Sequence, residues 1–276
     1  MGIEKVKVAA DAKSKSYYHF FERKMVDVPA DKKEILKHPY GKLGEGMEIE
    51  DRNHIFDKKI TSGEVGIFPL KNGGFSVANK TIYKGVKGEM LQWFFGWHAT
   101  DPLRYAIWDC YDHHGLEISE KDRAYILNPK TSIPDKCRNV HHRVLESLIP
   151  GEKPSTIDIY FADPKDLGYD TSKIFTDACS FFVCANAEIV TPKILPNMPV
   201  VMTHMAVDTE DGCELRSRFW MGYKIVDGVG KRCGFPEFLL KKLSGIFEKL
   251  LEHNFYEYTN LGVILPQLYA EEKDNW

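Results

Sequence analysis

The sequence predicts an α+β fold in which one long C-terminal helix lies on a curved antiparallel sheet. Segments rich in β-branched and aromatic residues, separated by clusters of Pro, Gly and Asp, favour strands. After them comes a long segment whose apolar residues have the three- and four-residue spacing of a helix. Strands followed by one packed helix are typical of an α+β domain. The expected strands are residues 156–161, 179–190, 200–207 and 214–226.

The first 85 residues are the least regular part of the sequence. They are rich in Lys, Asp, Gly and Pro and contain only short apolar runs such as residues 67–70. We therefore expect an N-terminal extension of loops and short elements over residues 1–85. The main domain is expected over residues 86–276 and should pack with the extension into one compact unit. Residues 89–97 are strongly aromatic and predict either a helix or a buried strand, because apolar content does not separate the two.

The last predicted strand and the helix after it have the clearest periodicity. In residues 214–226, apolar side chains alternate with charged or bulky ones, as in a strand with two different faces. Pro236 suits the first turn of the helix, and Pro266 is expected to end it. Between the two prolines, one helical face collects residues spaced by three and four: Leu239, Leu243, Ile246, Leu250, His253, Glu257, Leu261 and Ile264.

Composition and charge exclude several classes of protein. The chain has 276 residues and a formal net charge of -3, so it lacks the basic field that nucleic-acid binding needs. Its mean hydropathy is negative, which argues against an integral membrane protein. The N-terminus has no apolar signal segment, so we expect a cytoplasmic protein. The six cysteines form no CxxC pair, and free thiols in a reducing compartment are the expected state.

Two ionisable residues interrupt the apolar face of the predicted helix. His253 and Glu257 lie four residues apart, between Leu250 and Leu261. A buried carboxylate without a partner is costly, and a metal ion supplies a reason to place one there. Residues at positions i and i+4 project from adjacent turns, and imidazole nitrogen with carboxylate oxygen is a normal zinc ligand set. An exposed helical ion pair at the edge of the apolar face is the alternative interpretation.

Further ligands are expected in two histidine-containing segments. His113 and His114 end one of them, and we expect a metal ligand there. His141, His142 and Glu146 lie in the other, where we expect the two histidines in a solvated loop. One histidine and one carboxylate from these segments would complete a four-residue site.

Several stretches between residues 93 and 258 carry a resemblance to one family. They are WFFGWHATDPLRYAIWDCYDHHG, VHHRVLESLIP, IDIYFADP, SRFWMGY and HNFYE. Together they resemble the family of diacetylphloroglucinol hydrolase and phloretin hydrolase. The resemblance implies a Bet v1-like helix-grip fold with a central cavity, in which residues 86–276 form the catalytic domain. It also implies one zinc ion per chain, bound by His113, Glu146, His253 and Glu257. His114 competes with His113 for its role, and His142 with Glu146.

The resemblance further implies an activity and its substrate. The expected reaction cleaves the carbon-carbon bond between the acyl carbon and the ring of an acylphloroglucinol, above all phloretin, by metal-hydroxide attack and retro-Claisen-type cleavage. Tyr105 and His204 are the expected catalytic and substrate-binding residues, and Arg218 and Tyr223 further substrate contacts. The alternative interpretation is a structural role for Tyr105, Arg218 and Tyr223. A homodimer is also implied. The rival functions are a non-catalytic small-molecule binding protein and a diacetylphloroglucinol hydrolase.

Overall fold

One antiparallel sheet forms the centre of the molecule. The computed structural model describes residues 4–60, 62–191, 196–234 and 244–276. Within these residues, the strand order of the large sheet is β1-β2-β8-β7-β6-β5-β4-β3, and β9 and β10 form a separate two-stranded sheet. The strands are β1 Gly66–Pro69, β2 Phe75–Lys84, β3 His113–Ile118, β4 His141–Glu146, β5 Ser155–Phe161, β6 Phe181–Ile189, β7 Met198–Asp208, β8 Gly212–Met221, β9 Tyr223–Val226 and β10 Val229–Arg232.

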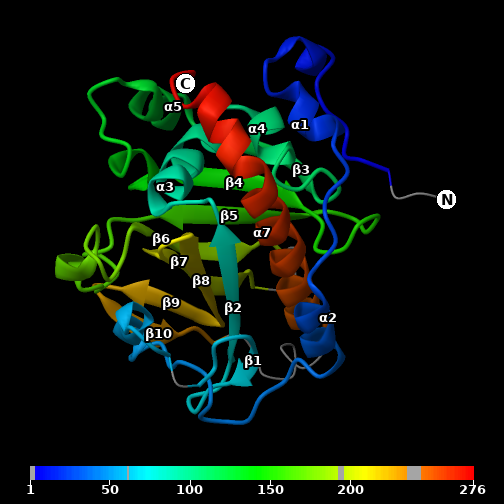
Figure 1. Cartoon of the computed structure of the whole chain (residues 1–276). Coiled ribbons are helices and arrows are strands. Elements are labelled where there is room, and N and C mark those ends of the chain that lie inside the picture. Colours follow the sequence, from blue (N-terminus) through cyan, green and yellow to red (C-terminus); the bar gives the residue numbers. More distant parts are fainter. Residues whose placement is uncertain (1–3, 61, 192–195, 235–243) are drawn as a thin grey trace.

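Helices pack on one face of this sheet. Figure 1 shows α7 lying across the sheet, whose strand direction turns strongly between β2 and β5. Such a change in direction is the accumulated twist of neighbouring strands. The predicted α+β, helix-grip architecture is thereby confirmed. The helices are α1 Tyr18–Glu22, α2 Ala30–Lys37, α3 Gly88–Trp97, α4 Pro102–Ala106, α5 Glu120–Leu127 and α7 Ser244–Glu272, and short 3-10 helices lie at Ala12–Ser14, Arg52–Phe56, His98–Thr100, Asp135–Cys137 and Thr171–Lys173.

The helix α7 extends beyond the residue that was expected to end it. Pro266 lies inside the helix, so the prediction of a stop there is wrong. A proline removes one backbone hydrogen bond, but tertiary packing can hold the following turns in place. Leu268 is fully buried after the proline, and the ring of Tyr269 packs 5.3 Å from that of Trp93 on α3. The expected start at Pro236, with Leu239 and Leu243, lies outside the described residues.

The aromatic residues 89–97, whose composition fits either a helix or a buried strand, form the helix α3. Residues of α3 are buried on nearly every side, and the helix packs against α7 and the strands β6 and β7. The expected strand over residues 214–226 is divided in two, because Gly222 has a positive φ of 88° between β8 and β9. Glycine adopts that conformation without steric cost.

The N-terminal segment contributes more to the sheet than its sequence indicated. The strand β2 pairs with β8 along ten residues, from Phe75 opposite Met221 to Lys84 opposite Gly212. Its inward polar residues are satisfied within the core: Asn79 donates to the side chain of Asn254 on α7 over 2.6 Å. One sheet therefore includes residues on both sides of the expected boundary at residue 85.

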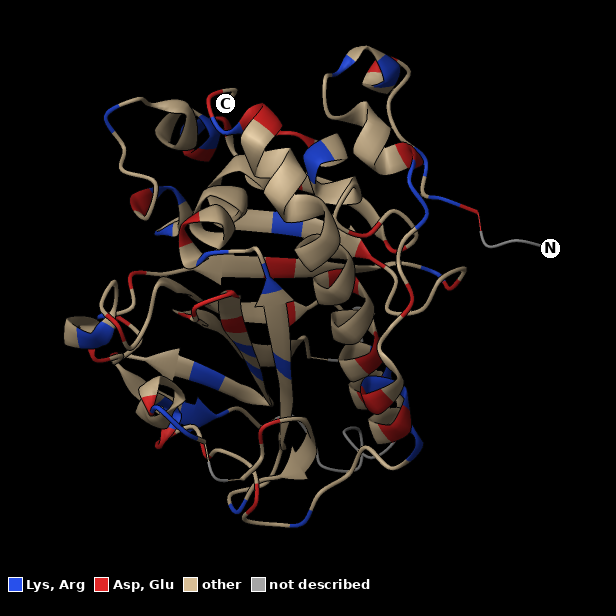
Figure 2. Ribbon diagram, viewed as in Figure 1, with Lys and Arg blue, Asp and Glu red and all other residues tan. Residues whose placement is uncertain are grey.

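The two faces of the sheet bury different clusters of side chains. The face beneath α3 and α7 holds the larger apolar cluster and a cavity. The opposite face packs against side chains from residues 47–56 and 167–179, and Trp220 and Ile49 are fully buried there. Figure 2 shows basic and acidic residues interspersed over loops and helices. In the part of the chain that the structure describes, no helix has the length and apolarity needed to cross a bilayer.

Candidate metal centre and its cavity

The four expected metal ligands come from three elements that the fold brings together. His113 begins β3 and Glu146 ends β4, and the antiparallel register places these two residues opposite each other. His253 and Glu257 lie one turn apart on α7. Antiparallel pairing and helical spacing therefore each supply two of the four side chains.

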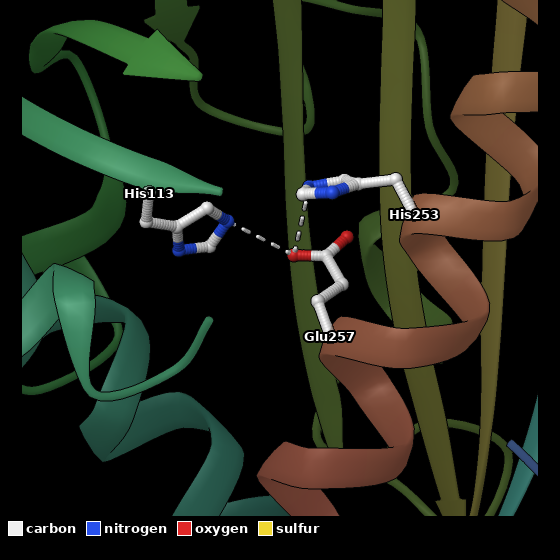
Figure 3. A group of neighbouring side chains, drawn as sticks. All are labelled: His113, His253 and Glu257. Atoms are coloured by element: carbon white, nitrogen blue, oxygen red, sulfur yellow. Dashed lines mark ion pairs between the residues drawn. The ribbon is translucent and has the colours of Figure 1, made fainter. Parts of the chain in front are cut away.

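Three of the four side chains converge on one point inside the protein. The Oε2 atom of Glu257 lies 3.6 Å from Nε2 of His113 and 4.0 Å from Nε2 of His253. One ligand atom from each residue lies within 4.8 Å of the other two, and all three residues are buried. Figure 3 shows the carboxylate between the two imidazole rings. This donor set of two imidazole nitrogens and a carboxylate oxygen fits a transition-metal ion such as zinc.

The fourth expected ligand, Glu146, borders this group. Its carboxylate accepts a hydrogen bond from the hydroxyl of Tyr105. Burial raises the pKa of Glu146, and the nearby positive charge of His253 opposes that shift. Glu146 lines the same cavity as His253 and Glu257 but does not belong to the converging group.

Local contacts direct His113, and not His114, toward Glu257. Nδ1 of His113 donates to the backbone carbonyl of Tyr105 over 3.1 Å, and the two rings stack with centroids 3.9 Å apart. This bond leaves Nε2 of His113 as the free acceptor on the side of Glu257. His114 instead contacts Oγ of Ser147 at 3.2 Å. His142 lines the cavity but does not belong to the converging group.

Unpaired buried atoms test whether these residues fit a metal ion. Nε2 of His113 is buried without a hydrogen-bond partner among the described residues. Burial raises the pKa of Glu257 well above its usual value and lowers that of His113 well below its own. Both pKa shifts reflect the cost of burying a charged group. A bound cation would offset this cost for the carboxylate of Glu257 and would pair with the free Nε2 of His113. The residues therefore fit a metal ion.

Two acidic residues that sequence reasoning missed lie behind His253. Its Nδ1 atom is 3.6 Å from Oδ2 of Asp112 and 4.0 Å from Oδ2 of Asp109. The other oxygen of Asp112 accepts from the hydroxyl of Ser147 over 2.6 Å, and that of Asp109 accepts from the backbone N–H groups of Tyr111 and Asp112. A carboxylate on the far nitrogen orients a histidine that binds a metal. Two acids just before a histidine pair are the signal that could have revealed this role.

The charges around His253 and Asp109 shift the pKa values of both groups. Burial lowers the pKa of His253, but the carboxylate of Asp112, 3.6 Å from Nδ1, and the charges of Glu257 and Asp109 outweigh it and raise the pKa to about 10. Burial raises the pKa of Asp109 to about 6, against the attraction of His253. Asp109, Asp112 and His253 also form a group that could hold an ion. The two groups share His253. Glu257 of the first group lines the cavity beside Tyr105, whereas Asp109 and Asp112 of the second group line a separate pocket.

A largely apolar cavity opens beside the converging side chains. Tyr105 and His204 both line it, as expected for groups that contact a substrate. Nδ1 of His204 lies 2.8 Å from Oγ of Ser217 and 3.1 Å from the hydroxyl of Tyr258. Burial lowers the pKa of His204 to about 3, so its ring is neutral at pH 7. The remaining polar lining residues are His98, His142, Glu146, His253, Glu257 and Tyr258.

Arg218 and Tyr223 lie away from this cavity, so the structure does not bring them to the expected substrate. Arg218 is on the opposite face of β8, where its Nη1 donates to the backbone carbonyls of Asn79 and Ser217. Tyr223 follows the turn at Gly222 and packs in the cluster on that same opposite face. The turn changes the side to which the alternating residues point, and the sequence period alone does not reveal it.

Comparisons with known proteins show which family the chain resembles. Residues 47–270 match the family model described as DAPG hydrolase PhiG domain. Phloretin hydrolase of Eubacterium ramulus is 34% identical over 99% of this chain and 96% of its own length. The 2,4-diacetylphloroglucinol hydrolase of Pseudomonas protegens is 25% identical over 81% of this chain and 73% of its own length.

Likeness to solved structures is weaker. A START superfamily protein from Mycobacterium smegmatis is 12% identical, covers 70% of this chain and 98% of its own, and has a TM-score of 0.36. Likeness at that level does not bear on function. The family model spans most of the chain and includes each element that places the converging side chains. This chain is a hydrolase and belongs to the DAPG hydrolase PhiG domain family, as its sequence motifs predict.

Proposed function

We propose that this protein hydrolyses the carbon-carbon bond between the acyl carbon and the ring of an acylphloroglucinol, with one zinc ion per chain. The substrate we propose is phloretin, and the products are phloroglucinol and 3-(4-hydroxyphenyl)propionate. The observation that carries the proposal is the convergence of His113, His253 and Glu257 beside a buried cavity, with a histidine nitrogen left unpaired. Glu146 is the proposed fourth ligand.

The residues around the cavity support this chemistry. A zinc ion bound there would supply a Lewis acid and an activated water molecule at neutral pH. The chain itself must orient the aromatic ketone, exclude bulk water and deliver a proton to the ring carbon. The hydroxyl of water goes to the acyl carbon and a hydrogen to the ring carbon as the bond between them breaks. Apolar lining residues such as Phe95, Phe161 and Phe219 provide the dry surroundings.

Tyr105 and His204 are the proposed groups for orientation and proton transfer. The hydroxyl of Tyr105 is held by Glu146, next to His113. His204 is held by Ser217 and Tyr258 beside the cavity, and its imidazole is the proposed carrier of a proton from a ring hydroxyl to the ring carbon. Both side chains are able to offer hydrogen bonds to the ring oxygens, where negative charge develops as the bond breaks.

One incubation tests the activity. Purified protein and phloretin should give equal amounts of the two products, detected by chromatography, and metal analysis should find close to one zinc ion per chain. Removal of the metal with a chelator should abolish turnover, and added zinc should restore it. A parallel incubation with diacetylphloroglucinol shows whether the protein hydrolyses phloretin, diacetylphloroglucinol or both. Binding of phloretin without turnover, in protein free of metal, would instead identify a small-molecule binding protein.

The proposal extends to assembly and location. We propose that the protein is cytoplasmic and forms a homodimer. The resemblance to the family implies the dimer, and light scattering coupled to size exclusion tests it directly. A mass equal to one chain would contradict this part of the proposal and leave the proposed reaction intact.

A further inference from the structure

The cavity has a second polar region on the wall formed by α3, β4 and the 3-10 helix that follows α3. His98 and His142 meet there with ring centroids 5.6 Å apart and planes at 77°. Both residues are buried, and both line the cavity. Neither belongs to the converging group of His113, His253 and Glu257. The proposed reaction therefore leaves these two histidines without a role.

The hydrogen bonds of the two rings are incomplete. Nδ1 of His98 lies 2.9 Å from the carbonyl of Phe94 and therefore carries the proton, which leaves its Nε2 as an acceptor. Nε2 of His142 is buried without a hydrogen-bond partner among the described residues. Both imidazoles are neutral, because burial lowers the pKa of His98 to about 4 and that of His142 well below its usual value. A neutral imidazole pair is able both to donate and to accept.

The surroundings of the pair select the kind of group that it can bind. Phe94 stacks on His98 with centroids 5.3 Å apart, and Phe161 packs 4.8 Å from His142. The acidic residues that line the cavity are Glu146 and Glu257, which belong to the candidate metal centre. An ionic group would lose its hydration at the histidine pair without gaining an opposite charge. An aromatic ring with one uncharged hydroxyl fits both the apolar walls and the two imidazoles.

The pair is connected to the candidate metal centre along one wall. Ring contacts lead from His113 to Tyr105 at 3.9 Å, from Tyr105 to His98 at 5.9 Å, and from His98 to His142. A substrate whose carbonyl lies at the metal centre is therefore able to reach the pair with its far end. The ring hydroxyls of an acylphloroglucinol are next to the carbonyl, so they remain near the metal centre.

We propose that His98 and His142 bind the phenolic hydroxyl at the distal end of the acyl chain and so select arylalkanoyl phloroglucinols over short-chain ones. This inference rests on the proposed function and names the part of the substrate that the remaining polar wall recognises. A site built to pair with a hydroxyl discriminates strongly against the analogue that lacks it, because its polar groups are then left unpaired.

A pair of substrates tests the inference. Phloretin is compared with 3-phenylpropanoyl phloroglucinol, which lacks only the distal hydroxyl. The unmodified protein should have a kcat/KM at least about tenfold higher for phloretin. His142→Leu should reduce the phloretin value alone and bring the ratio near one, whereas His142→Gln, which retains a donor and an acceptor, should keep most of the preference. His98→Leu is a second, independent variant with the same expectation as His142→Leu.

His141→Leu is the matched control. His141 is the neighbour of His142 on β4, but its ring stacks on Tyr160 and contacts Asp158, away from the cavity. The ratio of the kcat/KM values for the two substrates in His141→Leu should equal the ratio in the unmodified protein. An unchanged ratio in folded, metal-loaded His142→Leu and His98→Leu would overturn the inference.

Binding without turnover separates this inference from the proposed reaction. Calorimetric titration of the metal-loaded protein with phloretin and with the analogue measures the same preference when no product forms. If neither compound is hydrolysed but His142→Leu removes the binding preference, the reaction is wrong and the hydroxyl site stands. If both compounds are hydrolysed and bound equally well by the unmodified protein, the hydroxyl site is wrong and the reaction stands.

Discussion

At the scale of single residues, the candidate site depends on ionisable groups whose burial is tolerable only with a partner. His253 and Glu257 both face the interior from α7, and His113 meets them from β3. Each of these side chains would be solvated in an unfolded chain, so folding must offset the loss of hydration. A metal ion that binds the folded chain but not the unfolded chain would stabilise the folded state by mass action.

The carboxylate of Glu257 should be essential for metal binding. Glu257→Gln keeps the size of the side chain and removes its charge, so metal content should fall to a small fraction of one ion per chain. kcat/KM for phloretin should fall by more than about 100-fold, beyond the range typical for residues that only orient a ligand. Metal analysis and steady-state kinetics measure both quantities. Full activity with a normal metal content would remove Glu257 from the proposed site.

Asp112 should act through His253 and have a smaller effect. Asp112→Asn removes the negative charge that faces Nδ1 of His253. We expect metal affinity to fall by about 10- to 100-fold, with activity partly restored by excess zinc. Competition with a chelator measures the affinity. Asp166→Asn, at an exposed position, is the control and should bind metal normally. A merely structural role for Asp112 would lower stability without changing metal affinity.

Buried neutral histidines should make the protein sensitive to acid. Burial lowers the pKa of His98 to about 4 and that of His204 to about 3. Between those values and the unfolded pKa near 6.5, the unfolded chain binds more protons, so stability decreases as the pH falls. From pH 6.5 to 5, each such histidine should lower the free energy of unfolding by about 2 kcal/mol. Urea unfolding at pH 7 and pH 5 measures the loss.

A variant isolates one of these histidines. His98→Gln should lose less stability between pH 7 and pH 5 than the unmodified protein, because no proton uptake at residue 98 remains. His38→Gln, at an exposed position, should behave like the unmodified protein. Equal losses in all three proteins would show that His98 is not protonated on unfolding in this range.

At the scale of elements, α7 connects the site to the core. Its middle turns carry His253 and Glu257, and its last turns pack beyond Pro266 against α3. The backbone amide of residue 266 is missing from the hydrogen-bond ladder, so side-chain burial must hold that end of the helix.

Truncation of a buried residue after the proline tests this packing. Leu268 is fully buried, and Leu268→Ala should lower the free energy of unfolding by about 2–5 kcal/mol. Val263→Ala alters an exposed residue of the same helix and should change the free energy of unfolding by less than about 0.5 kcal/mol. Denaturant titration compares the two variants. Equal small effects would mean that the helix does not pack beyond Pro266.

At the scale of the whole molecule, the N-terminal segment completes the structure that encloses the cavity. β2 separates β1 from β8 in the sheet and pairs with β8 along its full length. Without it, β8 would expose an unpaired edge of backbone groups and its share of the core.

Removal of this segment should therefore prevent folding. A chain of residues 86–276 lacks β1 and β2, and we expect it to aggregate or remain unfolded on expression, as seen by solubility and circular dichroism. A shorter deletion of residues 1–16, which lie before α1, should be better tolerated. A soluble, cooperatively unfolding 86–276 fragment that binds zinc would instead support an independent catalytic domain.

Much of the architecture follows from local patterns in the sequence. The strands β5, β6 and β7 were predicted within a few residues, because each is an apolar run bounded by turn residues. The strands β2, β3 and β4 were missed, because polar residues interrupt their apolar pattern, and some of these residues find their partners only far away in the chain. Lys32 reaches Asn79 and Thr81 of β2 in this way.

The sequence by itself determined the family, the α+β class and the helix that carries His253 and Glu257, because periodicity and motifs are properties of neighbouring residues. Tertiary structure alone decided which histidine of the pair 113–114 turns inward, through its bond to the carbonyl of Tyr105. It also decided that Asp109 and Asp112 lie behind His253, and that Arg218 and Tyr223 point away from the cavity. Contacts between distant segments form only when the sheet closes around the helix, so no local pattern specifies them.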